Sequence, residues 1–159
     1  MKSSGFHHNG RIAAGALIFL LFAGLIPLLP VAAGQPDSPE ALRKTTSMAE
    51  TQHEIVVLLL KKKEYDRAAT EANRIFEMKW PESQEPLLLK ELQILIDLFL
   101  NQGQAPLALQ IIGKNSRNFK KTSSQIEILK ETGYIYKSLK QDEKALEYFQ
   151  KARELESRN

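Results

Sequence analysis

Cysteine is absent from the 159 residues of the chain. Disulfide bonds, thiolate catalysis and cysteine-ligated zinc are therefore excluded. Histidine is scarce, and only His53 follows the N-terminal apolar stretch, so neither a catalytic triad nor a metal site can be assembled around histidines. The eight glycines are scattered and form no glycine-rich phosphate loop. We expect no enzyme, no cofactor and no bound metal.

A large excess of one charge is also lacking. The chain has 22 basic and 19 acidic residues. Two of the basic residues, Lys2 and Arg11, precede the apolar stretch, and the remainder is nearly neutral. No global field steers this remainder toward nucleic acid, so we expect no nucleic-acid partner.

One long apolar run occupies residues 12–33, and residues 1–34 together predict a signal peptide or a signal anchor. A basic start, an uncharged middle and a finish of small residues favour a secretory signal peptide cleaved near Ala33. The run is also long enough to span a bilayer, which needs about 20 residues. The alternative is therefore an anchor in the inner membrane. Both interpretations place the rest of the chain in the periplasm or another extracytoplasmic space.

Residues 35–159 predict one all-α domain. The apolar periodicity predicts six helices, and short turns join them into three antiparallel hairpins. The predicted helices span residues 39–62, 65–79, 84–101, 106–116, 125–139 and 143–156. The hairpins accordingly cover residues 39–80, 84–117 and 125–157. Ser124 and Glu127 are interpreted as a capping box that opens the fifth helix.

The last hairpin carries small, aromatic and aliphatic residues at places that allow two helices to pack closely. These residues are Leu129, Gly133, Tyr136, Ala145, Phe149 and Ala152. Through its Gly and Tyr in the first helix and its Ala, Phe and Ala in the second, the hairpin resembles the tetratricopeptide repeat family. Leu129 stands where that family often has Trp. Ala68 and Ala108 match the alanine place of Ala145 at intervals of 40 and 37 residues. The resemblance implies a solenoid of three hairpins, with a family period of about 34 residues.

The resemblance also implies a concave groove, lined by the first helix of each hairpin, in which family members bind peptides. The register places seven residues there: His53, Val57, Gln93, Asp97, Lys130, Tyr134 and Lys137. The paired Lys and Asn with which some members clamp a C-terminal carboxylate are missing. Because Lys130 and Lys137 flank Tyr134, a ligand with apolar and acidic groups is expected. The predicted function is a non-catalytic interaction module, a scaffold or adaptor that binds a protein or peptide.

A basic stretch at residues 114–121 supports an alternative function. Lys114, Arg117, Lys120 and Lys121 occur where no acid lies between Asp97 and Glu127. Such a stretch could bind anionic lipid headgroups or an acidic polymer. A solvated linker is the other interpretation of the same residues.

Overall fold

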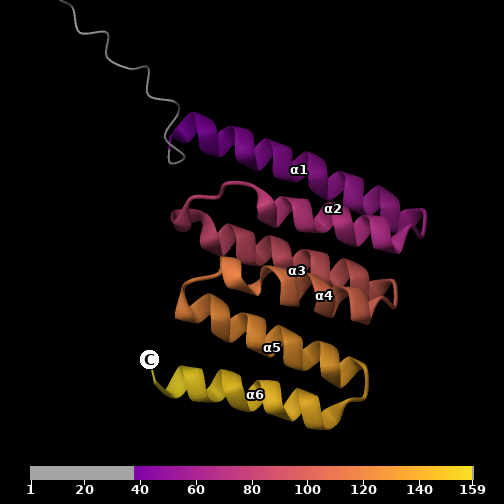
Figure 1. The fold of residues 1–159 in the computed structure, drawn as a ribbon, viewed down its shortest axis with the longest axis vertical. Coiled ribbons are helices and arrows are strands. Elements are labelled where there is room, and N and C mark those ends of the chain that lie inside the picture. The colour runs from indigo at the N-terminus through magenta and orange to yellow at the C-terminus, as the bar shows by residue number, and fades with distance from the viewer. Residues whose placement is uncertain (1–37, 159) are drawn as a thin grey trace, which may run out of the picture. The chain divides into compact units, whose positions relative to one another are not determined.

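The computed structural model describes residues 38–158 of the chain. Six α-helices, two short 3-10 turns and no strand make up this range (Figure 1). The helices are α1 (Pro39–Lys61), α2 (Tyr65–Glu77), α3 (Glu85–Asn101), α4 (Ala105–Asn115), α5 (Thr122–Ser138) and α6 (Asp142–Ser157). The 3-10 turns are η1 (Glu82–Gln84) and η2 (Ser116–Asn118). The all-α prediction is confirmed, and the apolar runs at 55–60 and 94–100 are helical rather than extended.

The predicted export segment, residues 1–34, lies outside the described residues. Among the helices that are described, none is long and apolar enough to cross a membrane.

The helix that opens the described range starts for the local reason that its sequence predicts. The hydroxyl of Ser38 accepts the Ala41 backbone N–H at 3.1 Å, and Pro39 occupies the first helical turn. A polar cap satisfies an N–H group that has no partner within the helix. Proline is favoured next to the cap because its fixed φ suits the first turn.

The start of α5 differs from the prediction, because the helix begins at Thr122 and its N-cap is Lys121. Ser124 lies buried inside the first turn and is not the capping residue. The cap comes from Glu85 on α3. Its carboxylate accepts the backbone N–H groups of Lys120 at 3.0 Å and Lys121 at 2.9 Å. The proposed capping box of Ser124 and Glu127 is therefore wrong, since a residue from another helix supplies the cap.

The same turn closes all three hairpins. A residue with left-handed backbone follows the first helix in each case: Lys63, Gly103 and Lys140. The next N–H then bonds to the carbonyl five residues back, as Glu64 to Leu59, Gln104 to Phe99 and Gln141 to Tyr136. This pattern satisfies carbonyls at the helix C-terminus. The left-handed residues are 40 and 37 residues apart, which equals the spacing of the three matched alanines.

The second helix of each hairpin carries a buried alanine near its start. The matched alanines Ala68, Ala108 and Ala145 are buried in the described structure. Their small side chains let each second helix approach the first helix of its hairpin closely. The repeat spacing that the sequence suggests is thus present in the backbone.

The hairpins pack in chain order, and neighbouring helices run antiparallel (Figure 1). First helices contact one another, α1 with α3 and α3 with α5, and α2 contacts α4. The largest wholly buried side chains are concentrated in α3, where Leu92, Leu95, Ile96 and Phe99 are almost inaccessible to solvent. A helix with apolar residues on most of its circumference is expected in an interior. The position of α3 between the other two hairpins agrees with this expectation.

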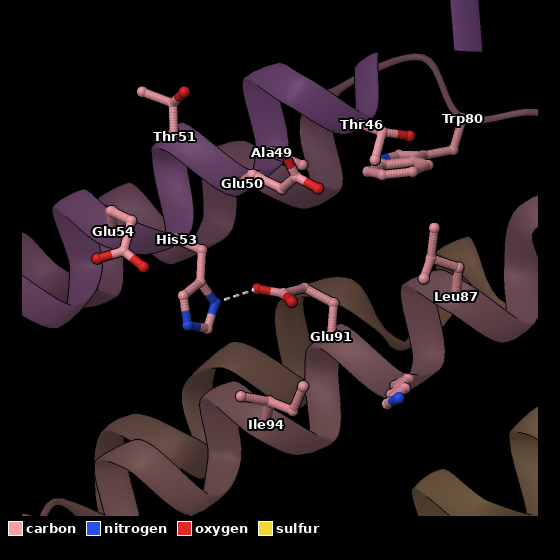
Figure 2. A pocket seen from close by; sticks show the side chains of 11 residues that line it. Thr46, Ala49, Glu50, Thr51, His53, Glu54, Trp80, Leu87, Glu91 and Ile94 are labelled. Carbon is pink, nitrogen blue, oxygen red and sulfur yellow. Dashed lines mark hydrogen bonds and ion pairs between the residues drawn. The ribbon is translucent and has the colours of Figure 1, made fainter. Parts of the chain in front are cut away.

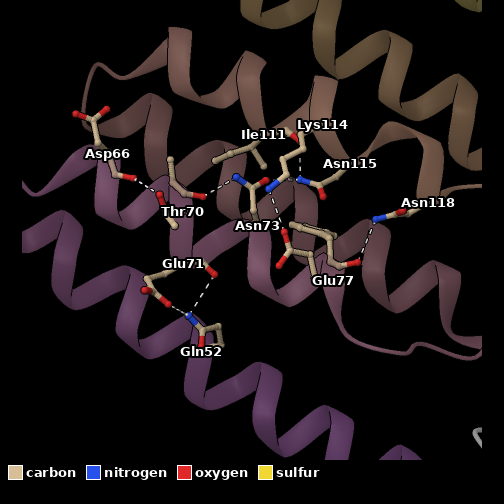
Figure 3. Close-up of polar contacts among 12 residues, drawn as sticks. Gln52, Asp66, Thr70, Glu71, Asn73, Glu77, Ile111, Lys114, Asn115 and Asn118 are labelled. Carbon is tan, nitrogen blue, oxygen red and sulfur yellow. Dashed lines mark hydrogen bonds and ion pairs between the residues drawn. The ribbon is translucent and has the colours of Figure 1, made fainter.

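Polar contacts join α2 to α4 and the turn that follows it (Figure 3). The buried amides of Asn73 and Asn115 meet at 2.6 Å, with Asn115 donating to Asn73. Lys114 pairs with Glu77 at 3.0 Å near the surface. A buried amide must find a partner or lose the free energy of its hydration. The Asn73–Asn115 contact therefore favours one register of α2 against α4.

Candidate functional site

A pocket of about 690 Å³ lies between α1 and α3, beside the segment that links α2 to α3 (Figure 2). Its lining comes from the two first helices and from Trp80. The residues are Thr46, Ala49, Glu50, Thr51, His53, Glu54, Trp80, Leu87, Lys90, Glu91 and Ile94. Of the predicted groove residues, His53 is the member that lines this pocket.

A short hydrogen bond between two residues that line the pocket joins α1 to α3. His53 points from α1 toward Glu91 on α3, and Nδ1 of the imidazole lies 2.6 Å from Oε1 of the carboxylate (Figure 2). Both side chains are about one-fifth exposed. The contact ties α1 to α3, and both residues line the pocket. Glu91 was not predicted as a site residue because its partner is 38 positions away.

Apolar side chains form much of the remaining pocket surface. Leu87 and Ile94 on α3 are 42% and 39% exposed, although each is large and aliphatic. They lie two helical turns apart on one face. Trp80, the single tryptophan of the chain, is held by its indole N–H, which donates to the Ile75 carbonyl at 2.8 Å. Trp80 is not among the site residues predicted from the sequence, because its place in the pocket depends on how α2 and α3 pack against α1.

The groove face continues from α3 to α5 through polar residues. Gln93 donates to the carboxylate of Glu131 at 3.1 Å. Burial raises the pKa of Glu131, and the nearby charges of Asp97 and Glu127 raise it further, against the effect of the Gln93 hydrogen bond. Two predicted groove residues, Gln93 and Asp97, are thus brought close to α5. The charges of Asp97 and Glu127 thus disfavour the ionised carboxylate of Glu131.

Lys130 is engaged within the protein. Its ammonium lies 2.6 Å from a carboxylate oxygen of Glu156 on α6 and 3.3 Å from one of Glu127. Hydrogen bonds to these two carboxylates raise the pKa of Lys130. The contact with Glu156 ties α5 to α6, so this cation is not free to attract an acidic ligand. The predicted preference for an acidic ligand rests on Lys130 and Lys137, and only Lys137 is left without such a pair among the described residues.

The other predicted groove residues lie farther along α1 and α5. Tyr134 is 57% exposed and meets the ring of Phe149 edge-on, with 5.1 Å between ring centroids. Lys137 is exposed and Val57 is half-buried. None of these three lines the pocket between α1 and α3.

The predicted packing residues lie between α5 and α6. A Cβ built on Gly133 would lie 2.9 Å from the Phe149 ring, so the absence of a side chain permits this approach. Ala145 and Ala152 are buried, and Leu129 is half-buried. Tyr136 stacks on Tyr148 with 5.3 Å between centroids.

The basic stretch at residues 114–121 is partly neutralised. Lys114 pairs with Glu77, and the charge of Lys121 acts on the carboxylate that caps α5. Arg117 and Lys120 line a smaller hollow of about 410 Å³. The other residues of this hollow are Phe76, Met78, Trp80, Leu88 and Asn118.

Within residues 38–158, no group of three or more acids or histidines is placed to hold a metal ion. Comparisons of the chain with protein-family models, with curated proteins and with solved structures give no match.

Proposed function

We propose that this chain is an exported tetratricopeptide-type protein that binds a segment of another protein in the groove between α1 and α3. The observation that carries the proposal is the pocket lined by Leu87, Ile94 and Trp80. Large apolar side chains exposed around a hollow are typical of a binding surface. Aromatic side chains at such surfaces often contribute much of the binding free energy.

The tetratricopeptide assignment is supported by the repeated hairpin. Three equivalent turns, three buried alanines at the same spacing and the contact of successive first helices are the features expected of stacked repeats. The Gly133–Phe149 approach adds a family-like contact in the last hairpin. A groove lined by first helices follows from this arrangement.

Binding, rather than catalysis, suits the chemistry of the pocket. The one hydrogen bond between two side chains that line it, His53 with Glu91, links two helices and pairs a single histidine with a single carboxylate. A nucleophile next to these two groups would be needed for a triad. The pocket instead offers apolar contact area with charged groups around it.

Site-specific photo-crosslinking tests the proposal. A photoreactive phenylalanine analogue replaces Leu87 in the groove, and the control carries it at Leu146, an apolar residue of α6 that is more exposed than Leu87. In cells, the protein with the probe at position 87 should form a discrete adduct that the control does not form. The double change Leu87→Ala, Ile94→Ala should then abolish binding of the identified partner by the purified protein. Identical adducts from both positions, or none from position 87, contradict the groove.

Export is tested by mass spectrometry of the protein from cell fractions. Cleavage should yield a mature N-terminus near Gly34 in the extracytoplasmic fraction. A full-length mass confined to membranes would identify the N-terminal segment as a retained anchor. A full-length protein in the soluble cytoplasmic fraction contradicts export.

A second candidate function rests on the smaller hollow. Arg117 and Lys120 present two cations beside the aromatic rings of Phe76 and Trp80, an arrangement that suits an anionic surface. Cosedimentation with vesicles that contain anionic lipid would detect it. Binding should fall steeply with added salt and with the change Arg117→Gln, Lys120→Gln. Retention of binding by that variant excludes the basic stretch as the site.

A further inference from the structure

Three carboxylates line the same pocket as the apolar side chains of the groove. Glu50 and Glu54 are exposed on α1, and Glu91 lies opposite them on α3 (Figure 2). Lys90 is the one lysine or arginine in the pocket lining. Among residues 38–158, no ion pair neutralises Glu50 or Glu54. The rim of the pocket therefore carries an excess of negative charge.

The negative charge continues along the same face toward α5. Asp97 is exposed on α3, and Glu131 lies close enough for the two charges to interact. Lys130, which precedes Glu131 on α5, is paired with Glu127 and Glu156. A bound cation would relieve the repulsion among these carboxylates, whereas a bound anion would add to it.

We propose that the groove between α1 and α3 binds a basic, amphipathic segment of a partner protein, with apolar side chains on Leu87 and Ile94 and lysines or arginines beside Glu50 and Glu54. This inference rests on the proposed function, because it names the chemistry of the segment that the groove takes. It reverses the acidic ligand that the sequence suggests from Lys130 and Lys137. Charge complementarity sets specificity and the rate of encounter, and the apolar contacts supply affinity.

The spacing of the apolar contacts constrains the partner further. Leu87 and Ile94 are seven residues apart, about 10 Å along the helix axis. A partner helix with apolar residues at i and i+7 matches this distance. The basic residues of the partner should lie on the side that faces α1.

Two synthetic peptides test the charge preference. Both are fluorescein-labelled 16-residue peptides with leucines at helical i, i+3, i+4 and i+7 spacing. The remaining positions alternate Ser with Lys in one peptide and Ser with Glu in the other. Fluorescence anisotropy with the purified full chain in a non-ionic detergent measures each dissociation constant. The quenching or shift of Trp80 emission reports contact at the pocket, since the chain has no other tryptophan.

The Lys peptide should bind at least about tenfold more tightly than the Glu peptide, which corresponds to about 1.4 kcal/mol. The variant Glu50→Gln, Glu54→Gln should lose most of this preference. A matched control removes two exposed acids from second helices, Asp66→Asn on α2 and Glu143→Gln on α6, and should keep it. Raising the salt concentration should weaken the Lys peptide selectively.

A third variant, Leu87→Ala with Ile94→Ala, separates the failure of this inference from the failure of the proposed function. If both peptides bind equally and both lose affinity in this variant, the groove binds segments but its charge preference is not the one proposed. If the control variant loses the Lys preference as much as the Glu50, Glu54 variant, net charge explains it and the inference is overturned. If neither peptide binds or changes Trp80 emission, the inference fails. The proposed function fails separately, when the probe at position 87 forms no crosslink.

Discussion

Gly133 allows a sharp test of how α5 packs on α6. A methyl group at this position would lie 2.9, 3.0 and 3.1 Å from three carbons of the Phe149 ring. Ordinary carbon–carbon contacts are about 3.5–4.0 Å, so the ring must move by roughly 0.5 Å. Tyr134 packs against the same ring and resists this movement. Overpacking of this kind costs about 1–3 kcal/mol.

Helix propensity acts in the opposite direction. Replacement of an interior helical glycine by alanine gains about 0.8–1 kcal/mol. We therefore expect Gly133→Ala to lower the free energy of unfolding by about 1 kcal/mol, the difference between the two effects. Gly113 on α4 is the matched control, since no atom beyond its chain neighbours and the adjacent backbone of its own helix lies within 4 Å of the Cβ that would be added there. Gly113→Ala should raise the free energy of unfolding by up to about 1 kcal/mol.

A double-mutant cycle with Phe149→Leu isolates the contact. In the background of that substitution the added methyl group meets less obstruction, so Gly133→Ala should become neutral or stabilising. Urea unfolding followed by circular dichroism gives the four free energies, and the coupling should be about 1–2 kcal/mol. If Gly133→Ala stabilises the protein as much as Gly113→Ala and shows no coupling to Phe149, the close approach of α5 and α6 is refuted.

Three further tests use the same unfolding assay. Glu85→Gln should cost about 1.5–3 kcal/mol at pH 7, because it weakens hydrogen bonds to a buried charge at the start of α5. Burial acts to raise the pKa of Glu85, but hydrogen bonds from Ser124 and the Lys120 and Lys121 backbone hold it below its ordinary 4.5. The stabilisation is thus present above pH 4.5 and lost as pH falls through the folded pKa, so the two proteins should converge in acid; a constant difference contradicts the cap. Lys63→Gly and Lys140→Gly should each stabilise by up to about 1 kcal/mol, since both lysines have left-handed backbone, and a loss contradicts that geometry. Leu95→Ala in the core should cost about 2–5 kcal/mol, whereas Ile55→Ala, at the equivalent but exposed place on α1, should cost below about 1 kcal/mol; equal costs contradict the burial of α3 between the other two hairpins.

The helices could be predicted because their causes are local. The capping residue Ser38 and the following Pro39 account for the start of α1. Gly103, with a φ of 71°, takes the left-handed position in the turn between α3 and α4. Apolar periodicity and short turns predict three hairpins, and the left-handed turn residues have the same spacing as the three matched alanines. The start of α5 was missed because its cap, Glu85, is 36 residues away from Lys121 in the chain.

The candidate site was predicted only in part. His53 was placed in the groove, but its partner Glu91 and the neighbouring Trp80 were not. Lys130 is predicted to face a ligand, but its ammonium forms an ion pair with Glu156 of the last helix. Each of these outcomes depends on a side chain from another helix.

The order of amino acids is enough to specify that the described part of this protein is helical, where its helices turn, and which small residues allow the hairpins to close. Periodicity, capping and turn chemistry act within a few residues, so they can be recognised along a short stretch of chain. The packed structure was needed to establish which side chains meet across neighbouring helices, and hence that the pocket rim is acidic. Contacts between residues 38 positions apart, such as His53 with Glu91 and Gln93 with Glu131, depend on the rotation and offset of one helix against the next. Those quantities are set by the packing of the whole core, and no local pattern specifies them.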